Sequence, residues 1–240
     1  MTTERLIVGL VFAGLMTAAA RRVAIVTDSG AVAGFLIAAA LPLAPTWAPL
    51  ALFVLFVVFG SASSRLGAEK KRALGVMQEN DGRRSWIHAV ANTGFAALAI
   101  LAGLADPRHA SLFEIGACGS LAAMLADTTA SEWGTWLGGR PRSILTWRRV
   151  PIGADGGVTL TGTLAAFVAA LAAALVAAAL RGDFRATLSA VAVAGVVGNT
   201  VDSMLGATVE PRLGKHGGAI VNALAASAGG AAAMFVMACV

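Results

Sequence analysis

Charge is scarce in this sequence. Only 13% of its 240 residues are Asp, Glu, Lys or Arg, whereas 58% are hydrophobic, and the mean hydropathy is +0.78. Because soluble globular domains carry roughly 25% charged residues, this composition excludes an ordinary soluble domain. We expect an all-α, polytopic membrane bundle that forms one integral-membrane domain over residues 1–240.

Residue sets for several common chemistries are also missing. The only cysteines, Cys118 and Cys239, lie inside apolar runs without metal-ligand spacing. The three histidines, His88, His109 and His216, are isolated, and there is no Ser-His-Asp arrangement, Cys/His cluster, dinucleotide fingerprint or Walker A motif. The pI near 10.2 comes without a nucleic-acid motif. We therefore expect the basic residues to anchor loops and bind phosphate, with no nucleic-acid partner.

Long apolar runs are abundant. About eight approach the ~20 residues needed to cross a bilayer, and six to eight spans are expected. They cover residues 6–20, 24–44, 46–62, 86–104, 112–130, 158–180, 186–206 and 218–239, of which the first and third are short. Arg21-Arg22 follow the first run, which indicates a span rather than a signal peptide. Similar Asp-containing tripeptides at 28–30 and 155–157 hint at a weak internal repeat.

Positive charge gathers on one side of this arrangement. If loops alternate, only Arg5, Arg108, Arg181 and Arg185 of the 18 Lys and Arg residues lie on the second side. By the positive-inside rule the first side is cytoplasmic, with loops at about 63–85 and 138–157. We expect a multi-pass protein of a prokaryotic inner membrane with its active face toward the cytoplasm.

Nearly every acid and amide side chain in or beside the runs is expected near the cytoplasmic face. Those near this face are Asp28, Asn92, Asp127, Glu132, Asp155, Asn199, Asp202 and Asn222. Acids inside a span cost ~3 kcal/mol on insertion scales and usually face a protein interior or a cavity. Polar side chains that merely reach toward the interface would occur near both membrane faces. Their clustering near one face therefore predicts a single polar site. The alternative is a helix-packing face of small residues with one acid reaching the interface.

The stretch from Leu125 to Gly134 carries two acids at the end of an apolar run. Asp127 and Ser131 share a helix face, whereas Glu132 lies about 140° round from Asp127 on an ideal helix. The glycine-rich turn at 152–157 would let backbone N–H groups approach an anion before the next helix. Gly162-Thr163, just beyond it, is equally compatible with close helix packing.

These side chains suit a polyanion held through a divalent cation. Mg²⁺ takes one or two carboxylates together with phosphate oxygens, and phosphoryl transfer needs mainly positioning and charge neutralisation. We predict Asp127, Glu132 and Asp202 as catalytic metal ligands. The predicted substrate- and phosphate-binding residues are Lys70, Lys71, Arg84, Asn92, Ser131, Asp155, Gly156, Gly157, Thr163, Asn199 and Asn222.

Several motifs resemble those of the transmembrane-protein-19-like family (domain of unknown function 92). They are Ala126-Asp127-Thr128-Thr129-Ala130-Ser131-Glu132-Trp133-Gly134, Gly153 to Val158 with Gly162-Thr163, Asp202-Ser203 with Leu205 to Ala207, Asn222, Ser29 to Ala31 and Lys70-Lys71. They occur in the family's order over essentially the whole chain. One departure is Asp155, where the family usually has Asn.

The resemblance implies an activity, since this family includes phytyl-phosphate kinase. It implies a membrane kinase that converts an isoprenoid (phytyl or prenyl) monophosphate to its diphosphate, with Mg²⁺ and CTP or ATP. The lipid substrate would enter sideways from the bilayer. Two enzymatic alternatives on a related scaffold are a CDP-lipid synthase and a prenol kinase. A non-enzymatic alternative is a transporter with an ion-coupled polar site, although transporters place such sites near the bilayer midplane.

Overall fold

Helices make up nearly all of the regular structure. The computed structural model describes residues 3–76 and 83–240. The α-helices are α1 (Thr3–Arg22), α2 (Asp28–Ala40), α3 (Ala48–Arg65), α4 (Ala68–Ala73), α5 (Trp86–Ala105), α6 (Ala110–Leu137), α7 (Leu160–Arg181), α8 (Phe184–Thr208), α9 (Glu210–Leu213) and α10 (Gly217–Cys239). Short 3-10 turns are η1 (Leu41–Leu43), η3 (Pro107–His109) and η4 (Gly214–His216), and the strands are β1 (Arg142–Ser143) and β2 (Gly157–Val158).

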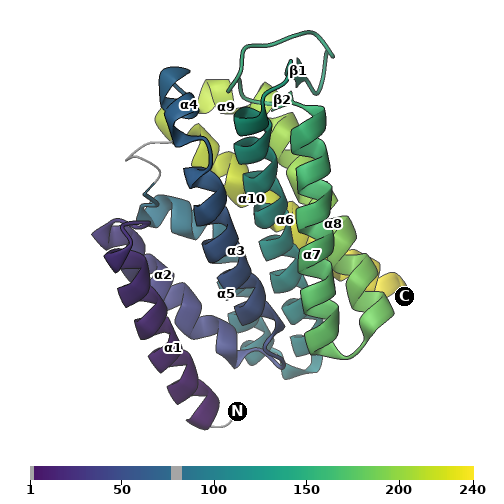
Figure 1. Ribbon diagram of the computed structural model, residues 1–240. Helices are drawn as coiled ribbons and strands as arrows, with labels where there is room; N and C mark the ends of the chain where they lie inside the picture. Colours follow the sequence, from purple (N-terminus) through teal and green to yellow (C-terminus); the bar gives the residue numbers. More distant parts are fainter. Residues whose placement is uncertain (1–2, 77–82) are drawn as a thin grey trace.

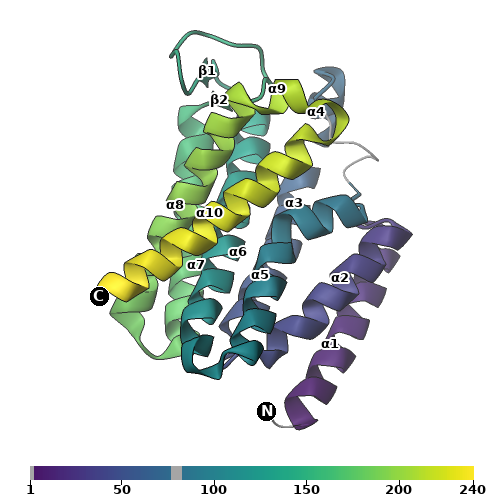
Figure 2. The same cartoon turned by 180° about the vertical axis from the view of Figure 1, so that it is seen from behind.

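The long helices form a bundle around α6 (Figure 1). This 28-residue helix packs against α3, α5, α7, α8 and α10. Figure 2 shows α10 crossing the back of the bundle diagonally, over α8, α6 and α5. Helix α1 lies at the edge and packs mainly against α2 and η1.

Eight apolar segments match the eight predicted runs. Within the described ranges, seven helices are long and apolar enough to cross a membrane, and Asp28–Leu43 is a shorter apolar segment. The expectation that the first and third runs are the short ones was wrong, because α1 has 20 residues and α3 has 18. The short element is α2. It begins only at Asp28, and Pro42 then favours the tighter η1 turn over continued α-helix.

Two connections expected as cytoplasmic loops lie at one end of the bundle. Figure 1 shows α4, the β1–β2 hairpin and α9 together there, which we call the basic end, and the start of α1 and the α7–α8 turn at the opposite end. The strands pair antiparallel, with Arg142 opposite Val158 and Ser143 opposite Gly157. The first connection contains helix α4, and its residues 77–82 lie outside the described ranges.

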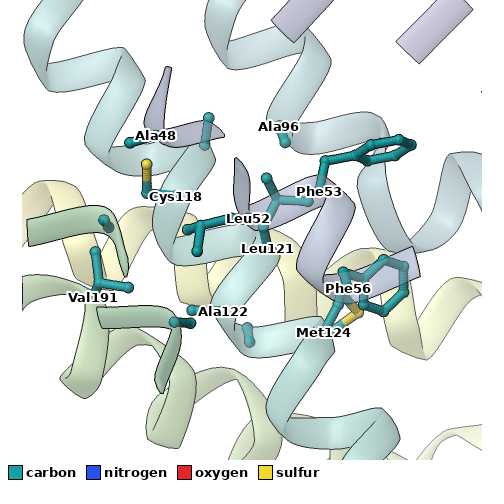
Figure 3. Close-up of a cluster of buried hydrophobic side chains, with 14 of the residues drawn as sticks. Ala48, Leu52, Phe53, Phe56, Ala96, Cys118, Leu121, Ala122, Met124 and Val191 are labelled. Atoms are coloured by element: carbon teal, nitrogen blue, oxygen red, sulfur yellow. The ribbon is translucent and has the colours of Figure 1, made fainter. Parts of the chain in front are cut away.

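Small residues bring the central helices close together. A Cβ atom on Gly198 of α8 would lie 2.2 Å from Ala123 Cβ on α6, and one on Gly229 of α10 would lie 2.5 Å from the same atom. Such small-residue contacts are typical of membrane helices, where close packing stabilises association. Figure 3 shows larger side chains, including Phe56 and Met124, filling the core between α3 and α6. This packing fixes the spacing of the helices that carry the polar residues.

Candidate functional site at the basic end

Two carboxyl groups from different helices meet inside the bundle. The carboxyl groups of Asp127, in the second half of α6, and Asp202, near the end of α8, lie within hydrogen-bonding reach of each other, and both residues are half-buried. Two carboxylates at this separation repel each other, so a proton or a cation must lie between them. The structure thus places two of the three predicted metal ligands beside each other, while their role in binding a metal stays a prediction.

Two amides extend the polar group toward α5 and α10. Asn92 is 3% exposed, and its Oδ1 lies 2.9 Å from the side-chain amide of Asn222. When the Asn222 amide nitrogen faces α8, it donates to Asp202 Oδ1 at 3.1 Å and to Gly218 O at 3.2 Å. Four helices, α5, α6, α8 and α10, thus each contribute one polar side chain to a contiguous group.

Arg84 brings a positive charge to the same region. Its guanidinium carbon lies 5.2 Å from the centre of the Phe56 ring, and the carboxylates of Asp127 and Glu132 are its main charged neighbours. Burial lowers the pKa of the Arg84 guanidinium, while these two carboxylates act in the opposite direction. The predicted phosphate-binding arginine therefore lies beside the carboxyl pair.

Glu132 has other partners. Its Oε2 lies 2.5 Å from Lys71 Nζ, and its Oε1 accepts from Ser64 Oγ at 2.6 Å. The side chains of Lys71 and Glu132 are only 3% and 6% exposed. This buried ion pair attaches α4 to α3 and α6. A metal-binding role for Glu132 or a phosphate-binding role for Lys71 would require the two to separate, and both roles stay predictions.

The neighbouring lysine also attaches α4 to the bundle. Lys70 is exposed and its Nζ donates to Trp136 O, at the end of α6, at 2.8 Å. Its exposure leaves the ammonium group accessible from the water side. Of the two predicted lysines, Lys70 is the one that can reach a soluble anion without breaking a buried contact.

The glycine-rich turn packs against the end of α8. Gly156 has φ +68°, and a Cβ atom there would lie 2.4 Å from Ala207 Cβ and 2.6 Å from Ser203 O. Only glycine combines this left-handed conformation with so close an approach. Asp155 is exposed beside it, near enough for its charge to act on Asp202 and on Glu210. The residues predicted from the sequence did not include Glu210, although this acid follows closely after the apolar run at 186–206.

Three predicted residues take no part in the carboxyl pair. Ser131 and Thr163 are exposed, and Asn199 is half-buried on α8. Among the described residues, none of these three side chains hydrogen-bonds to Asp127 or Asp202. Their predicted substrate contacts stay predictions.

Gly162, near the start of α7, lies against the backbone of α6. A Cβ atom there would lie 2.7 Å from Ala130 O on α6, so this glycine serves close helix packing. The Thr159 hydroxyl caps α7 by accepting from the Gly162 N–H at 3.0 Å, as Thr27 does for Gly30 at 3.2 Å. The two helix starts share this cap, while the predicted internal repeat stays a prediction.

Asp127 and Asp202 fit an open Mg²⁺ site better than a metal site made only of protein ligands. Within the part of the chain that the structure describes, no three His, Cys, Asp or Glu side chains are placed to hold a metal ion. Mg²⁺, however, commonly takes only one or two protein carboxylates and completes its shell with water and phosphate oxygens. Asp127 and Asp202 offer that number of carboxylates.

Glu114 is an exception to the expected clustering of acids and amides near one face. This residue near the start of α6 is 1% exposed and forms a buried ion pair with Arg181 at the opposite end of the bundle. The Glu114 carboxylate also accepts a hydrogen bond from the Thr46 N–H, with 2.7 Å between the nitrogen and Oε1. The opposite end therefore has a charged network of its own.

Comparison with known proteins places the chain in a family. Residues 11–237 match the model of the family described as Integral membrane protein DUF92. The chain belongs to this family. It is thus a multi-pass integral membrane protein, as its composition predicts.

Relatives come from plants and archaea. The chain is 28% identical to Protein PGR of Arabidopsis thaliana, over 76% of this chain and 71% of that protein. It is 32% identical to an uncharacterized membrane protein of Methanocaldococcus jannaschii, over 75% and 73%. It is 28% identical to Protein VTE6, chloroplastic, of Arabidopsis thaliana, over 78% of this chain and 57% of that protein. No solved structure matches.

Proposed function

We propose that this protein is a membrane-embedded kinase that converts an isoprenoid (phytyl or prenyl) monophosphate to its diphosphate. The observation that carries the proposal is the pair of carboxyl groups, Asp127 and Asp202, enclosed by helices beside Arg84. Family membership supports this reaction class. The location of the site near the basic end, rather than at the middle of the bundle, favours an enzyme over an ion-coupled transporter.

Each residue of the site would have a separate role in phosphoryl transfer. A terminal oxygen of the lipid monophosphate attacks the γ-phosphorus of the nucleotide, whose bond to the β–γ bridging oxygen breaks, releasing nucleoside diphosphate. Mg²⁺, when bound, would neutralise phosphate charge, and Asp127 and Asp202 would hold it. Arg84 would bind phosphate oxygens through its planar set of donors. Asn222, which is hydrogen-bonded to Asn92, would orient the Asp202 carboxyl group.

The chain's orientation gives each substrate a route. We propose that the basic end faces the cytoplasm, because the exposed cations of α4 and of the 138–157 connection lie there. CTP or ATP would then reach the site from water, near Lys70 and the glycine-rich turn. The lipid would enter from the bilayer with its phosphate at this end. Both substrates meet at the carboxyl pair only if this orientation holds.

The test incubates the purified protein in detergent with labelled CTP or ATP, Mg²⁺ and a panel of prenols, prenyl monophosphates and phosphatidic acid. We expect label in a prenyl diphosphate, and its loss in Asp127→Asn. This variant can still hydrogen-bond to Asp202, so its thermal stability should match the wild type. Asp106→Asn, which changes an exposed acid at the opposite end, should keep full activity.

Other outcomes would favour one of the alternative functions or refute the site. Label transferred to a prenol alone would make the protein a prenol kinase, and a CDP-lipid formed from CTP and phosphatidic acid would make it a CDP-lipid synthase. Full activity in Asp127→Asn would refute the site. If neither nucleotide changes the melting temperature and no product forms, the transporter alternative gains.

A further inference from the structure

The turn between α1 and α2 holds the backbone of Arg84. The Arg84 N–H donates to Ile25 O at 3.0 Å, and the Thr27 N–H donates to Arg84 O at 3.1 Å. Val26 and Arg84 thereby form an isolated parallel bridge between two segments far apart in the sequence. Arg65, at the end of α3, donates to Val23 O at 2.5 Å and ties the same turn to the bundle.

Gly30 makes this pairing possible. A Cβ atom at position 30 would lie 2.1 Å from Arg84 O and 3.1 Å from Arg84 C, distances that side chains do not adopt against backbone. The Thr27 hydroxyl accepts from the Gly30 N–H at 3.2 Å and so holds the first turn of α2 in this position. Any side chain at position 30 must therefore displace the Arg84 backbone or the start of α2.

The side chain of Arg84 points from this anchored backbone into the site. Its guanidinium lies over the Phe56 ring. Gly60 lies beside the guanidinium, and a Cβ atom at Gly60 would be 3.7 Å from Arg84 Nη2. Among the described residues, no carboxylate lies within 4.0 Å of the guanidinium, and its N–H groups donate to no other side chain or backbone carbonyl. These donors can therefore bind an anion that enters beside Asp127.

We propose that Gly30 is a positioning residue, which sets the Arg84 backbone so that the guanidinium binds a phosphate oxygen of the substrate beside Asp127. The identity of the anion rests on the proposed function, whereas the placement of Arg84 rests on the contacts of the turn. Arg84 would contact the substrate, whereas Gly30 lies against the backbone of Arg84 and Ser85 and acts through it. Because bidentate recognition of phosphate by arginine depends on the orientation of the fork, a backbone shift weakens it.

The first test compares Gly30→Ala with Gly34→Ala, one turn later on α2, where a Cβ atom meets nothing within 4 Å. We expect Gly30→Ala and Arg84→Ala each to lower kcat/KM for the lipid monophosphate by roughly 10- to 100-fold, the range for losing a hydrogen bond to a charged group. Gly34→Ala should match the wild type. Wild-type kinetics in Gly30→Ala would overturn the proposal.

A double-mutant comparison separates positioning from general damage. If Gly30 acts through Arg84, Gly30→Ala should cost nothing further in the Arg84→Ala background. Guanidinium ion added to Arg84→Gly should restore part of the activity, and this rescued activity should be the same with or without Gly30→Ala. Losses that multiply, or a rescued activity that Gly30→Ala lowers, would mean a structural role and overturn the proposal.

Thr27→Pro covers the case in which Gly30→Ala does not fold. It removes both the N–H that donates to Arg84 O and the hydroxyl that caps α2, at a residue whose φ of −80° suits proline. Its kcat/KM should fall as in Arg84→Ala, again without adding to that loss in the double variant. Turnover equal to the wild type would overturn the proposal.

Binding of inorganic pyrophosphate keeps the two proposals distinguishable. We expect it to raise the melting temperature of the wild type and of Gly34→Ala, but not of Gly30→Ala or Arg84→Ala. If this pattern appears without any phosphoryl transfer, the kinase proposal fails and the positioning of Arg84 stands. If transfer occurs and Arg84→Ala retains both turnover and stabilisation, the kinase stands and the positioning proposal fails.

Discussion

Arg181 at the end of α7 and Glu114 near the start of α6 form a buried ion pair, with side chains 3% and 1% exposed. Glu114 Oε1 also accepts from the Thr46 N–H at 2.7 Å, and Arg181 Nε donates to Thr187 Oγ1 at 3.2 Å. The pair therefore joins the entry to α3 with α6, α7 and the start of α8. It stabilises the end of the bundle that lies away from the carboxyl pair.

Glu114→Ala should destabilise the protein by about 3–5 kcal/mol, because it leaves Arg181 buried without a counter-charge. The free energy of unfolding in detergent measures the loss. The double change Glu114→Met and Arg181→Met should cost less than either single change, since apolar groups can replace a buried pair. Arg185→Ala, at an exposed neighbour, should alter stability by less than about 0.5 kcal/mol. A Glu114→Ala protein as stable as the wild type would contradict the structural role.

Glu132→Gln should weaken folding more than magnesium binding. The change leaves Lys71, 3% exposed, without its carboxylate and should cost about 3 kcal/mol. The Mg²⁺ concentration for half-maximal activity should stay near the wild-type value. Asp202→Asn, in contrast, should raise it at least roughly tenfold, by analogy with the loss of a metal-site contact. A Mg²⁺ requirement that rises in Glu132→Gln would show that Glu132 binds the metal after all.

The spans and the carboxyl pair could be predicted because they depend on one-dimensional properties. A run of about 20 apolar residues implies a span wherever its neighbours lie. Alternation of spans then puts the ends of the fifth and seventh runs, with Asp127 and Asp202, at the same face. Asn92 and Asn222 follow from the same alternation. These four side chains do meet in the structure.

Pairings between helices could not be predicted in the same way. Whether Glu132 meets a metal or Lys71 depends on where the short helix α4 docks, and hydropathy does not report this. Glu114 was overlooked because its partner Arg181 belongs to another helix, and only the packing of α6 against α7 brings them together. The role of Gly30 likewise depends on a contact with Arg84, which no local pattern reveals.

Gly156→Ala should lower both stability and turnover. Its φ of +68° strains any side chain, and the added Cβ atom would lie 2.6 Å from Ala207 N, so the glycine-rich turn must move away from α8. Gly182→Ala is the control, since Gly182 is also left-handed, with φ +91°, but nothing lies within 4 Å. We expect the control to lose about 1 kcal/mol from backbone strain alone, and Gly156→Ala to lose more. Equal losses would mean that the turn does not depend on this contact.

Asp155→Asn should strengthen nucleotide binding. Asp155 is exposed at the turn where the family usually has Asn, and its charge acts on Asp202 and Glu210. Removing one negative charge near an entering triphosphate should lower its KM about two- to fivefold, in line with the ~1 kcal/mol or less of exposed charge interactions. The value of kcat should stay unchanged.

Salt and magnesium distinguish this electrostatic effect from metal ligation. At about 1 M salt the screening length falls to roughly 3 Å, so the KM values of Asp155→Asn and the wild type should converge. Asp106→Asn removes the same charge at the opposite end and should leave KM unchanged at any salt concentration. If Asp155 instead binds the metal, Asp155→Asn would need more Mg²⁺ for half-maximal activity, and its KM for the nucleotide would rise. The direction of the KM change therefore decides between a repelling charge and a metal ligand at position 155.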